Sequence, residues 1–228
     1  MSKIPDFLEI FFFIIVTGLP QTLLLTALGL FSGFILGISL ALMRVYGSKE
    51  LGWLASSYEK VFRSIPLLVM IYIFAFGIPG LFWYIDPLDR SLAGVVLALA
   101  LRSGAYQSQI FRGAILSVDP GQMEAARALG MNRFRAFRHV IMPQAFRLAV
   151  PSWSNEYAVV IKDSSFAYAV GIIEMTRAAY YVSVNYPELL GISMAIVTIL
   201  YFLFTYPATR IFGEHQAKKL KELGMGGG

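Results

Sequence analysis

The 228-residue chain contains no cysteine and only two histidines, His139 and His215. The lack of cysteine excludes a disulfide framework and a thiolate metal site, and with two histidines we expect no metal site on this chain. Charge is also scarce, because 14% of the residues are charged, whereas soluble domains carry about 25%. With 57% hydrophobic residues and a mean hydropathy of +0.65, the sequence predicts an all-α integral membrane protein.

Five apolar stretches are long enough to cross a membrane, which takes about 20 residues in a helix. We expect them near Gly18–Met43, Tyr58–Gly77, Ser91–Leu116, Pro143–Val170 and Glu188–Phe212. Another apolar run precedes the first span, and the two together would reach roughly 55 Å, too long for one crossing. We therefore expect a break at Gly18 and Pro20, with residues 1–17 as an N-terminal interfacial segment. The transmembrane domain then covers residues 18–212, and residues 213–228 form a tail.

Lys and Arg residues decide the orientation of the five spans, since cytoplasmic segments carry an excess of both. Most of the 19 Lys and Arg residues fall on the side of the C-terminus. This asymmetry predicts the N-terminus outside and the C-terminus in the cytoplasm, with the loop 117–142 between spans three and four also cytoplasmic. The net charge of +5 is thus explained by orientation in a lipid membrane, and we expect no nucleic-acid partner.

The loop 117–142 carries its own helix punctuation. Asp119 suits an N-cap, Pro120 the first helical position and Gly130 a left-handed stop, while Gln122 can close a capping box. These signals predict a helix of about ten residues.

A second short helix is expected to begin after an Asn132 cap and to end at Pro143, where span four begins. An apolar stripe along it should lie against the membrane domain of the same chain; its members are Phe134, Phe137, Val140 and Ile141.

The first of these helices has a nearly bare surface at Ala125, Ala126 and Ala128. A bare helix permits close approach by another protein, and Glu124 in its first turn favourably opposes the helix dipole and offers an acceptor to a partner. The alternative is an ordinary surface loop built from good helix formers.

The same residues carry a family resemblance. The loop resembles the EAA loop of binding-protein-dependent ABC importer permeases, where E-A-A, three residues, G and nine residues precede I-x-L-P. Here Val140 and Met142 replace the Ile and the Leu. Four further stretches resemble the polar amino-acid subfamily of histidine, glutamate and arginine permeases: Val61–Leu68, Leu101–Tyr106, Ile110–Gly113 and Ile161–Ser165.

The resemblance implies a transport subunit and not an enzyme, and the sequence has no GxxxxGK[ST] phosphate loop. It implies a coupling helix at Glu124, Ala125, Ala126, Ala128 and Gly130. It also implies a second permease, identical or homologous, two ATPase subunits that hold ATP and Mg, and an extracytoplasmic solute-binding protein. The expected function is uptake of a polar amino acid by alternating access in the cytoplasmic (inner) membrane of a prokaryote, with another small polar solute as the alternative.

Charges inside the spans are costly and therefore indicate function. An α-amino acid presents a carboxylate and an ammonium, so a site holding both signs would match it. We expect such a site to be lined by Arg102, Ser103, Tyr106, Glu156, Asp163 and Ser164. The alternative is a structural salt bridge between Arg102 and Glu156, with Lys162 and Asp163 facing water in an outer vestibule.

Outside the membrane, contacts with the solute-binding protein are expected at Asp86, Asp89, Glu174 and Arg177. Two other classes of protein are alternatives to the importer. An intramembrane enzyme could use Ser103 as a nucleophile, but both histidines lie in segments assigned to the cytoplasm, away from it. An ion-coupled secondary transporter would also use buried acids, but five spans without a visible repeat argue against it.

Overall fold

The computed structural model describes residues 6–77 and 86–222. Every regular element in these ranges is helical, which confirms the all-α prediction. The α-helices are α1 (Phe7–Tyr46), α2 (Lys49–Ser64), α3 (Leu67–Tyr72), α4 (Pro87–Leu116), α5 (Pro120–Ala128), α6 (Arg133–Ala136), α7 (Met142–Asp163), α8 (Met175–Asn185), α9 (Leu190–Ala208) and α10 (His215–Glu222). Wider π-helical turns are η1 (Ile73–Gly77), η2 (Phe137–Ile141) and η5 (Thr209–Glu214), and 3₁₀ turns are η3 (Ser164–Val170) and η4 (Pro187–Leu189).

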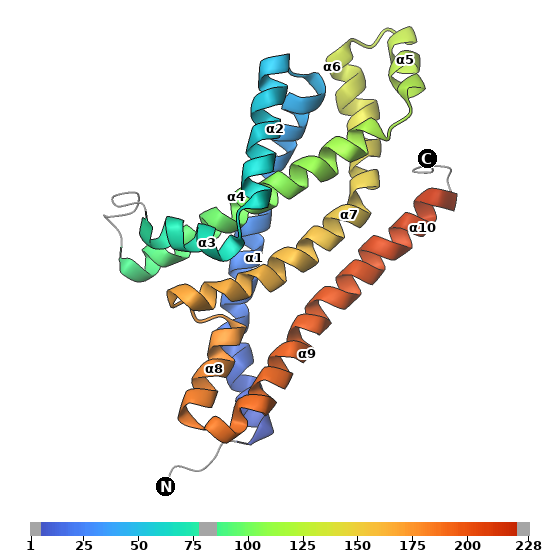
Figure 1. Ribbon diagram of the computed structural model, residues 1–228. Helices are drawn as coiled ribbons and strands as arrows, with labels where there is room; N and C mark the ends of the chain where they lie inside the picture. Colours follow the sequence, from blue (N-terminus) through green and yellow to red (C-terminus); the bar gives the residue numbers. More distant parts are fainter. Residues whose placement is uncertain (1–5, 78–85, 223–228) are drawn as a thin grey trace.

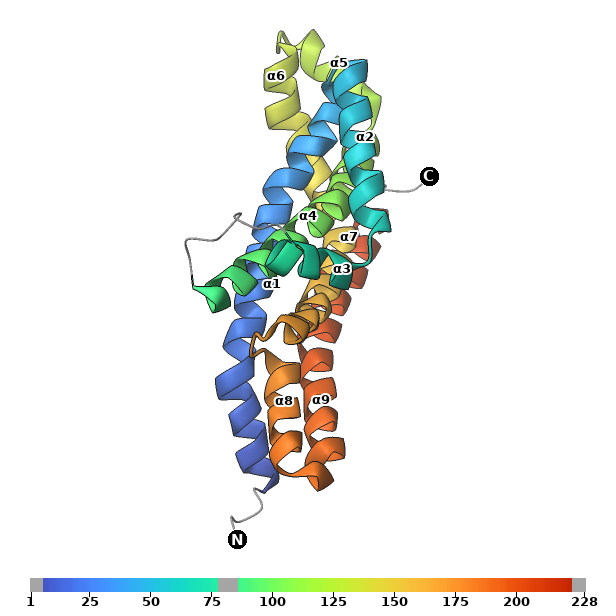
Figure 2. The same cartoon turned by 60° about the vertical axis from the view of Figure 1, so that its left-hand side comes forward.

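The helices are arranged along one long axis. Figures 1 and 2 show α2, α5 and α6 at one end of the molecule, and the start of α1 with α8 and the start of α9 at the other end. The helices α4 and α7 run obliquely between these ends. The loop 117–142 and the beginning of α1 are therefore far apart.

Two helices in the described part of the chain are long and apolar enough to cross a membrane, Phe7–Tyr46 and Pro187–Lys218. A third qualifies when α2 and Leu67–Gly77 are counted as one broken span. The helices α4 and α7 have 30 and 22 residues, but polar side chains lower their hydropathy.

The expected break at Gly18 and Pro20 is wrong, because α1 is one helix of 40 residues with Pro20 inside it. Neighbouring helices can compensate a proline in a membrane helix. Here α8 packs closely on α1: a Cβ atom at Gly18 would lie 2.6 Å from Met175 Cα, and Thr22 Oγ1 accepts a hydrogen bond from the Met175 backbone at 3.2 Å. Residues 1–5 of the predicted interfacial segment lie outside the described residues.

The boundary expected at residue 213 is not a break in the helix either. The last span continues through η5 into α10, and Pro187–Lys218 forms one helix of 32 residues. Thr209 Oγ1 donates to the Thr205 backbone oxygen at 3.2 Å, so polar side chains support the backbone where the wider turn begins. Residues 223–228 of the predicted tail lie outside the described residues.

The second span is not a straight helix over Tyr58–Gly77. Its two halves, α2 and the helix from Leu67, meet at an angle of 100°. Pro66 causes the bend, because proline disfavours the helical conformation of the residue before it. Ile65 is accordingly extended, with φ −82° and ψ 130°. The prediction of a span over Tyr58–Gly77 did not include a turn of this size.

The helix α8 lies between the fourth and fifth expected spans, where the sequence analysis predicts no helix. It begins at Glu174, whose carboxylate accepts the backbone N–H groups of Thr176 at 2.7 Å and Arg177 at 2.8 Å and the Tyr201 hydroxyl at 3.1 Å. Glu174 is fully buried. The prediction that it contacts a binding protein is therefore wrong, while Arg177 is half-buried and Asp86 and Asp89 are exposed.

The helices α1 and α4 pack through the small-residue face at Gly29, Gly33 and Gly37. A Cβ atom at Gly37 would lie 2.7 Å from Gln107 Cβ and 3.0 Å from the Ser108 backbone nitrogen. Small residues allow such close approach of membrane helices. The glycine repeat is thus a packing face within this chain.

Candidate functional site

The loop 117–142 folds largely as its punctuation predicts. The Asp119 carboxylate accepts the Gly121 backbone N–H at 2.7 Å and begins α5. The prediction of a capping box is wrong, since the Gln122 side chain accepts a hydrogen bond from Gln144 Nε2 at 3.2 Å instead.

The helix α5 ends in a left-handed stop, as expected. Gly130 has φ +84°, which favours glycine. Its backbone N–H donates to Arg127 O at 3.0 Å, and the Met131 N–H donates to Ala126 O at 3.1 Å, the two bonds of a Schellman motif. The stop fixes the direction in which the chain leaves α5.

The surface of α5 is bare at the expected residues with one exception. Glu124, Ala125, Ala128 and Gly130 are exposed, whereas Ala126 is buried against the rest of the chain. Leu129 at the end of α5 is 82% exposed. A small-residue face beside an exposed leucine is suited to docking against another protein.

The second helix of the loop begins at Asn132, whose side chain accepts the Arg135 N–H at 2.9 Å. It does not end at Pro143, because the wide turn η2 leads directly into α7. Proline lacks an N–H donor, and a π-helical turn accommodates the missing hydrogen bond. The segment Arg133–Asp163 is thus continuously helical, so that movement of α6 can be transmitted to α7.

The apolar stripe of this helix packs as predicted at three of its four positions. Phe137 lies 5.0 Å from the Tyr46 ring between centroids, and Val140 and Ile141 belong to the core formed with α1 and α4. The prediction for Phe134 is wrong, because its side chain is 70% exposed. Phe134 lies on the same loop as Leu129, which is also exposed. Two large apolar side chains are therefore presented at this end of the molecule.

The charged residues that are expected inside the spans form a cluster between α4 and α7. Arg102 and Asp163 form an ion pair, with side chains 20% and 15% exposed. Ser103 Oγ donates to Glu156 Oε1 at 2.7 Å. The alternative pairing of Arg102 with Glu156 is therefore not formed in this structure, and Lys162 is exposed.

Tyr106 joins the cluster through its ring. The guanidinium carbons of Arg63 and Arg102 lie 4.9 Å and 5.2 Å from the ring centroid, within the range of a cation–π contact. Arg63 is thus close to the candidate site. Its side chain is exposed.

Gln107 is a member of the cluster that sequence reasoning missed. Its amide donates to Ser103 Oγ at 3.0 Å and to Leu30 O at 3.1 Å, and it accepts from Trp153 Nε1 at 2.9 Å. The signal in the sequence is its position one turn after Ser103, on the same face of α4. Gln107 fixes the Ser103 hydroxyl so that its proton points to Glu156.

Ser164 is the predicted site residue with the weakest connection to this cluster. It is fully buried, and its hydroxyl donates to the Ile161 backbone oxygen at 2.7 Å. This hydrogen bond lies within the helical turn of Ser164 and does not involve the Arg102–Asp163 ion pair.

A second buried acid, Glu59, was also missed. It is 2% exposed and accepts hydrogen bonds from Arg44, Ser108 and Gln109. Through these hydrogen bonds the Glu59 carboxylate links α2 to α1 and α4. The bond to Ser108 is 2.5 Å long.

Comparison with known proteins identifies the chain. Residues 33–221 match the family described as "Binding-protein-dependent transport system inner membrane component". The chain belongs to this family. The family expected from the EAA-like loop is therefore confirmed, and the chain is a permease component of a transport system.

Individual relatives are similar over nearly the whole chain. The "Octopine transport system permease protein OccM" of Rhizobium meliloti is 39% identical over 217 residues, covering 91% of this chain and 86% of the relative. The "Arginine transport system permease protein ArtQ" of Bacillus subtilis is 35% identical over 210 residues, covering 91% and 92%.

Solved structures agree with these relatives. The structure described as "Crystal structure of an amino acid ABC transporter with histidines" is 31% identical and has a TM-score of 0.76, covering 94% of this chain and 99% of that chain. An inward-facing MetNI methionine ABC transporter has a TM-score of 0.70 at 20% identity, a likeness of fold alone.

Proposed function

We propose that this chain is the transmembrane subunit of an ATP-driven ABC importer that takes up a polar amino acid by alternating access. The observation that carries the proposal is the family match over residues 33–221. Relatives named for octopine, arginine and glutamine transport support an amino-acid substrate. The candidate cluster holds charges of both signs, as an amino acid requires.

The proposed topology has five spans: α1, the bent pair α2 and α3, α4, α7 and α9. The N-terminus is outside and the C-terminus is in the cytoplasm of a prokaryote, with the inner membrane between them. The excess of Lys and Arg on one side supports this orientation. So does the separation of the start of α1 from α5, which lie at opposite ends of the molecule (Figure 1).

The proposed coupling element is α5, with Glu124, Ala125, Ala128 and Gly130 facing an ATPase subunit. Buried Ala126 holds the helix against the same chain. ATP and Mg bind to the partner, and this chain carries no cofactor. When the ATPase subunits close, α5 moves with them, and the continuous helix from α6 through α7 transmits the movement to Glu156 and the residues around it.

The proposed substrate site is the cluster around Arg102. The α-carboxylate of the substrate binds the Arg102 guanidinium in competition with Asp163, and the released Asp163 carboxylate can accept the substrate ammonium. Glu156, fixed by Ser103 at 2.7 Å, supplies a second acceptor. The Tyr106 ring shields the guanidinium on one side, so the exchange takes place in a partly dehydrated site where charge interactions are strong.

The remaining partners follow from the family: a second permease, identical or homologous, two ATPase subunits and an external solute-binding protein. Arg177 and the exposed carboxylates Asp86 and Asp89 are proposed contacts for the binding protein.

Uptake into proteoliposomes tests the function. The permease is reconstituted with its ATPase and solute-binding protein, and accumulation of labelled arginine, glutamine and glutamate is measured. The expected result is uptake of at least one of them that requires ATP inside and the binding protein outside. Uptake driven by a proton or sodium gradient without ATP would support the ion-coupled alternative and contradict the proposal.

A further inference from the structure

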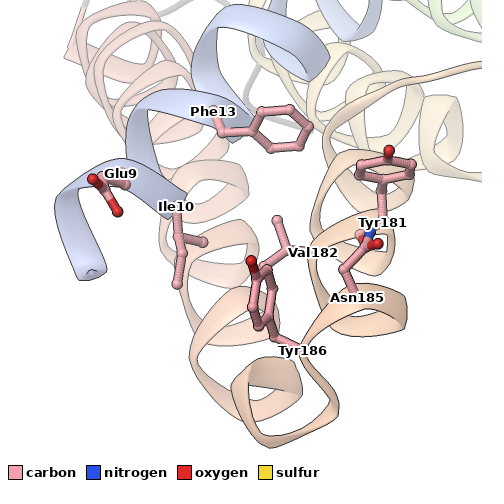
Figure 3. Close-up of a pocket in the computed structure, with 7 residues that line it drawn as sticks. All are labelled: Glu9, Ile10, Phe13, Tyr181, Val182, Asn185 and Tyr186. Carbon is pink, nitrogen blue, oxygen red and sulfur yellow. The ribbon is translucent and has the colours of Figure 1, made fainter. Parts of the chain in front are cut away.

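A cavity of about 370 Å³ opens between the beginning of α1 and the end of α8 (Figure 3). It is at the end of the molecule opposite α5, away from the Arg102 cluster. Its lining residues are Glu9, Ile10, Phe13, Tyr181, Val182, Asn185 and Tyr186. The candidate transport site uses none of these residues.

The lining combines a carboxylate with aromatic rings. The rings of Phe13 and Tyr181 are stacked with centroids 6.0 Å apart, and Tyr186 projects between α1 and α8 (Figure 3). Ile10 and Val182 are buried at its base. Aromatic faces attract cations, and ammonium groups are held in this way by aromatic cages. The carboxylate and the rings together therefore select a cation.

Glu9 has the capacity to bind such a cation. Its Oε2 accepts the Asp6 backbone N–H at 3.0 Å, and within residues 6–77 and 86–222 its Oε1 accepts no hydrogen bond and Glu9 forms no ion pair. One carboxylate oxygen is thus available to a ligand.

The level of the cavity relative to the membrane points to the kind of ligand. Between Glu9 and Arg44 the helix α1 contains no charged residue, and at 1.5 Å per residue this run is longer than the hydrocarbon core of about 30 Å, so Glu9 lies at the membrane surface or beyond it. Phe7, Leu8 and Phe12 are exposed around it. Exposed aromatic residues at the end of a span are typical of the level of the lipid headgroups.

We propose that this cavity binds the primary ammonium headgroup of a phospholipid. The ammonium lies between the Glu9 carboxylate and the rings of Tyr181 and Tyr186. The acyl chains follow the exposed face of α1 past Phe12 and Val16. The proposal goes beyond the transport function and requires only that this end of α1 lies at a membrane surface.

Lipid retention tests the proposal. The whole transporter is purified from bilayers of equal phosphatidylethanolamine and phosphatidylglycerol, and the retained lipids are counted by mass spectrometry. We expect ethanolamine lipid to be enriched at least about threefold over glycerol lipid, as a contact of carboxylate and rings with an ammonium implies. The enrichment should disappear in Glu9→Gln, in which the capping bond to Asp6 can persist because Gln also closes a capping box.

The matched control is Asp6→Asn. It removes one negative charge from the same helix end, but Asp6 does not line the cavity, and Asn is an equally good N-cap. Enrichment should therefore survive. A second pair compares Tyr181→Ala, which should lower the enrichment, with Tyr180→Ala, whose ring lines a neighbouring cavity and should not.

Three results would overturn the proposal. The first is enrichment that is unchanged in Glu9→Gln, and the second is an equal loss in Asp6→Asn. The third is full displacement of the lipid by soluble phosphoethanolamine at equal concentration, which would assign the cavity to a free amine. ATP-driven uptake is measured on the same preparations, so that a failure of the transport proposal is recorded separately from a failure of this one.

Discussion

Two acidic residues on either side of α4 differ in how completely the protein satisfies them. Glu59 on α2 is 2% exposed and receives hydrogen bonds from three side chains of α1 and α4. Glu156 on α7 is 5% exposed and, within the described residues, receives one hydrogen bond, from Ser103. The two carboxylates are thus similarly buried but have unequal numbers of hydrogen-bond partners.

The difference separates structure from function. A buried carboxylate that is fully paired stabilises the fold, and its removal leaves an uncompensated charge on its partner. A buried carboxylate with spare acceptor capacity is costly to keep and can bind a ligand that supplies the missing donors. We therefore propose that Glu59 stabilises the fold and that Glu156 takes part in transport.

The largest effect is expected for Glu59→Ala. The variant leaves Arg44, Ser108 and Gln109 without their common acceptor, and loss of one partner of a buried ion pair destabilises by about 3–5 kcal/mol. Thermal unfolding of the purified permease complex and its amount in the membrane measure this effect. Unchanged stability would contradict the structural role of Glu59.

Glu156→Gln should have the opposite profile. The amide oxygen of Gln can still accept from Ser103, so unfolding should change by no more than about 1 kcal/mol. Uptake should fall at least about tenfold because the charge that holds the substrate ammonium is lost. Arg102→Ala should lower uptake similarly. Normal transport by both variants, with normal assembly and ATPase activity, would remove the substrate site.

Gly37→Ala tests whether the surroundings of Glu59 and of Glu156 both depend on the close packing of α1 against α4, called the seam below. The added methyl group would contact Gln107 and Ser108. Gln107 is hydrogen-bonded to Ser103, which donates to Glu156, and Ser108 donates to Glu59. Overpacking of this kind destabilises by about 1–3 kcal/mol, and both stability and uptake should fall.

The matched control for this seam is Gly113→Ala on α4, where no atom lies within 4 Å of the new Cβ. It should be neutral or stabilise the helix by up to about 1 kcal/mol. Equal behaviour of the Gly37 and Gly113 variants in chemical unfolding would contradict the seam.

The smallest effect is expected for Trp153→Phe. The substitution removes the donor to Gln107 Oε1 and should destabilise by about 1 kcal/mol. Because Gln107 orients Ser103, we expect the uptake rate to fall by more than the small loss of stability alone would cause. A variant that lowers stability and leaves the KM for uptake unchanged would show that Gln107 does not position the site.

The family and the helical architecture were predictable because their signals are local. Spans are read from the length and hydropathy of each run, and the limits of α5 from Asp119 and Gly130. The continuity of α1 was not predictable, since Pro20 favours a break and the packing of α8 beside it, at Gly18 and Thr22, involves residues far along the chain.

The missed polar residues share one cause. Glu59 and Gln107 were not singled out, and Glu174 was given another role, because each depends on partners on other helices; these hydrogen bonds join residues between 15 and 77 positions apart. The pairing of Arg102 with Asp163 rather than Glu156 depends in the same way on how α4 and α7 cross. Sequence spacing identified the charged residues of the candidate site but not which of them meet.

Cross-linking of α5 tests the central claim most directly. The chain has no cysteine, so Ala125→Cys, on the exposed face of α5, introduces a unique thiol. The account predicts a disulfide to a cysteine placed in the ATPase subunit, loss of ATP-driven uptake when it forms, and recovery on reduction, while buried Ala126→Cys does not cross-link. Reaction of the Ala125→Cys thiol with an impermeant reagent applied to the outside of intact cells would contradict the account.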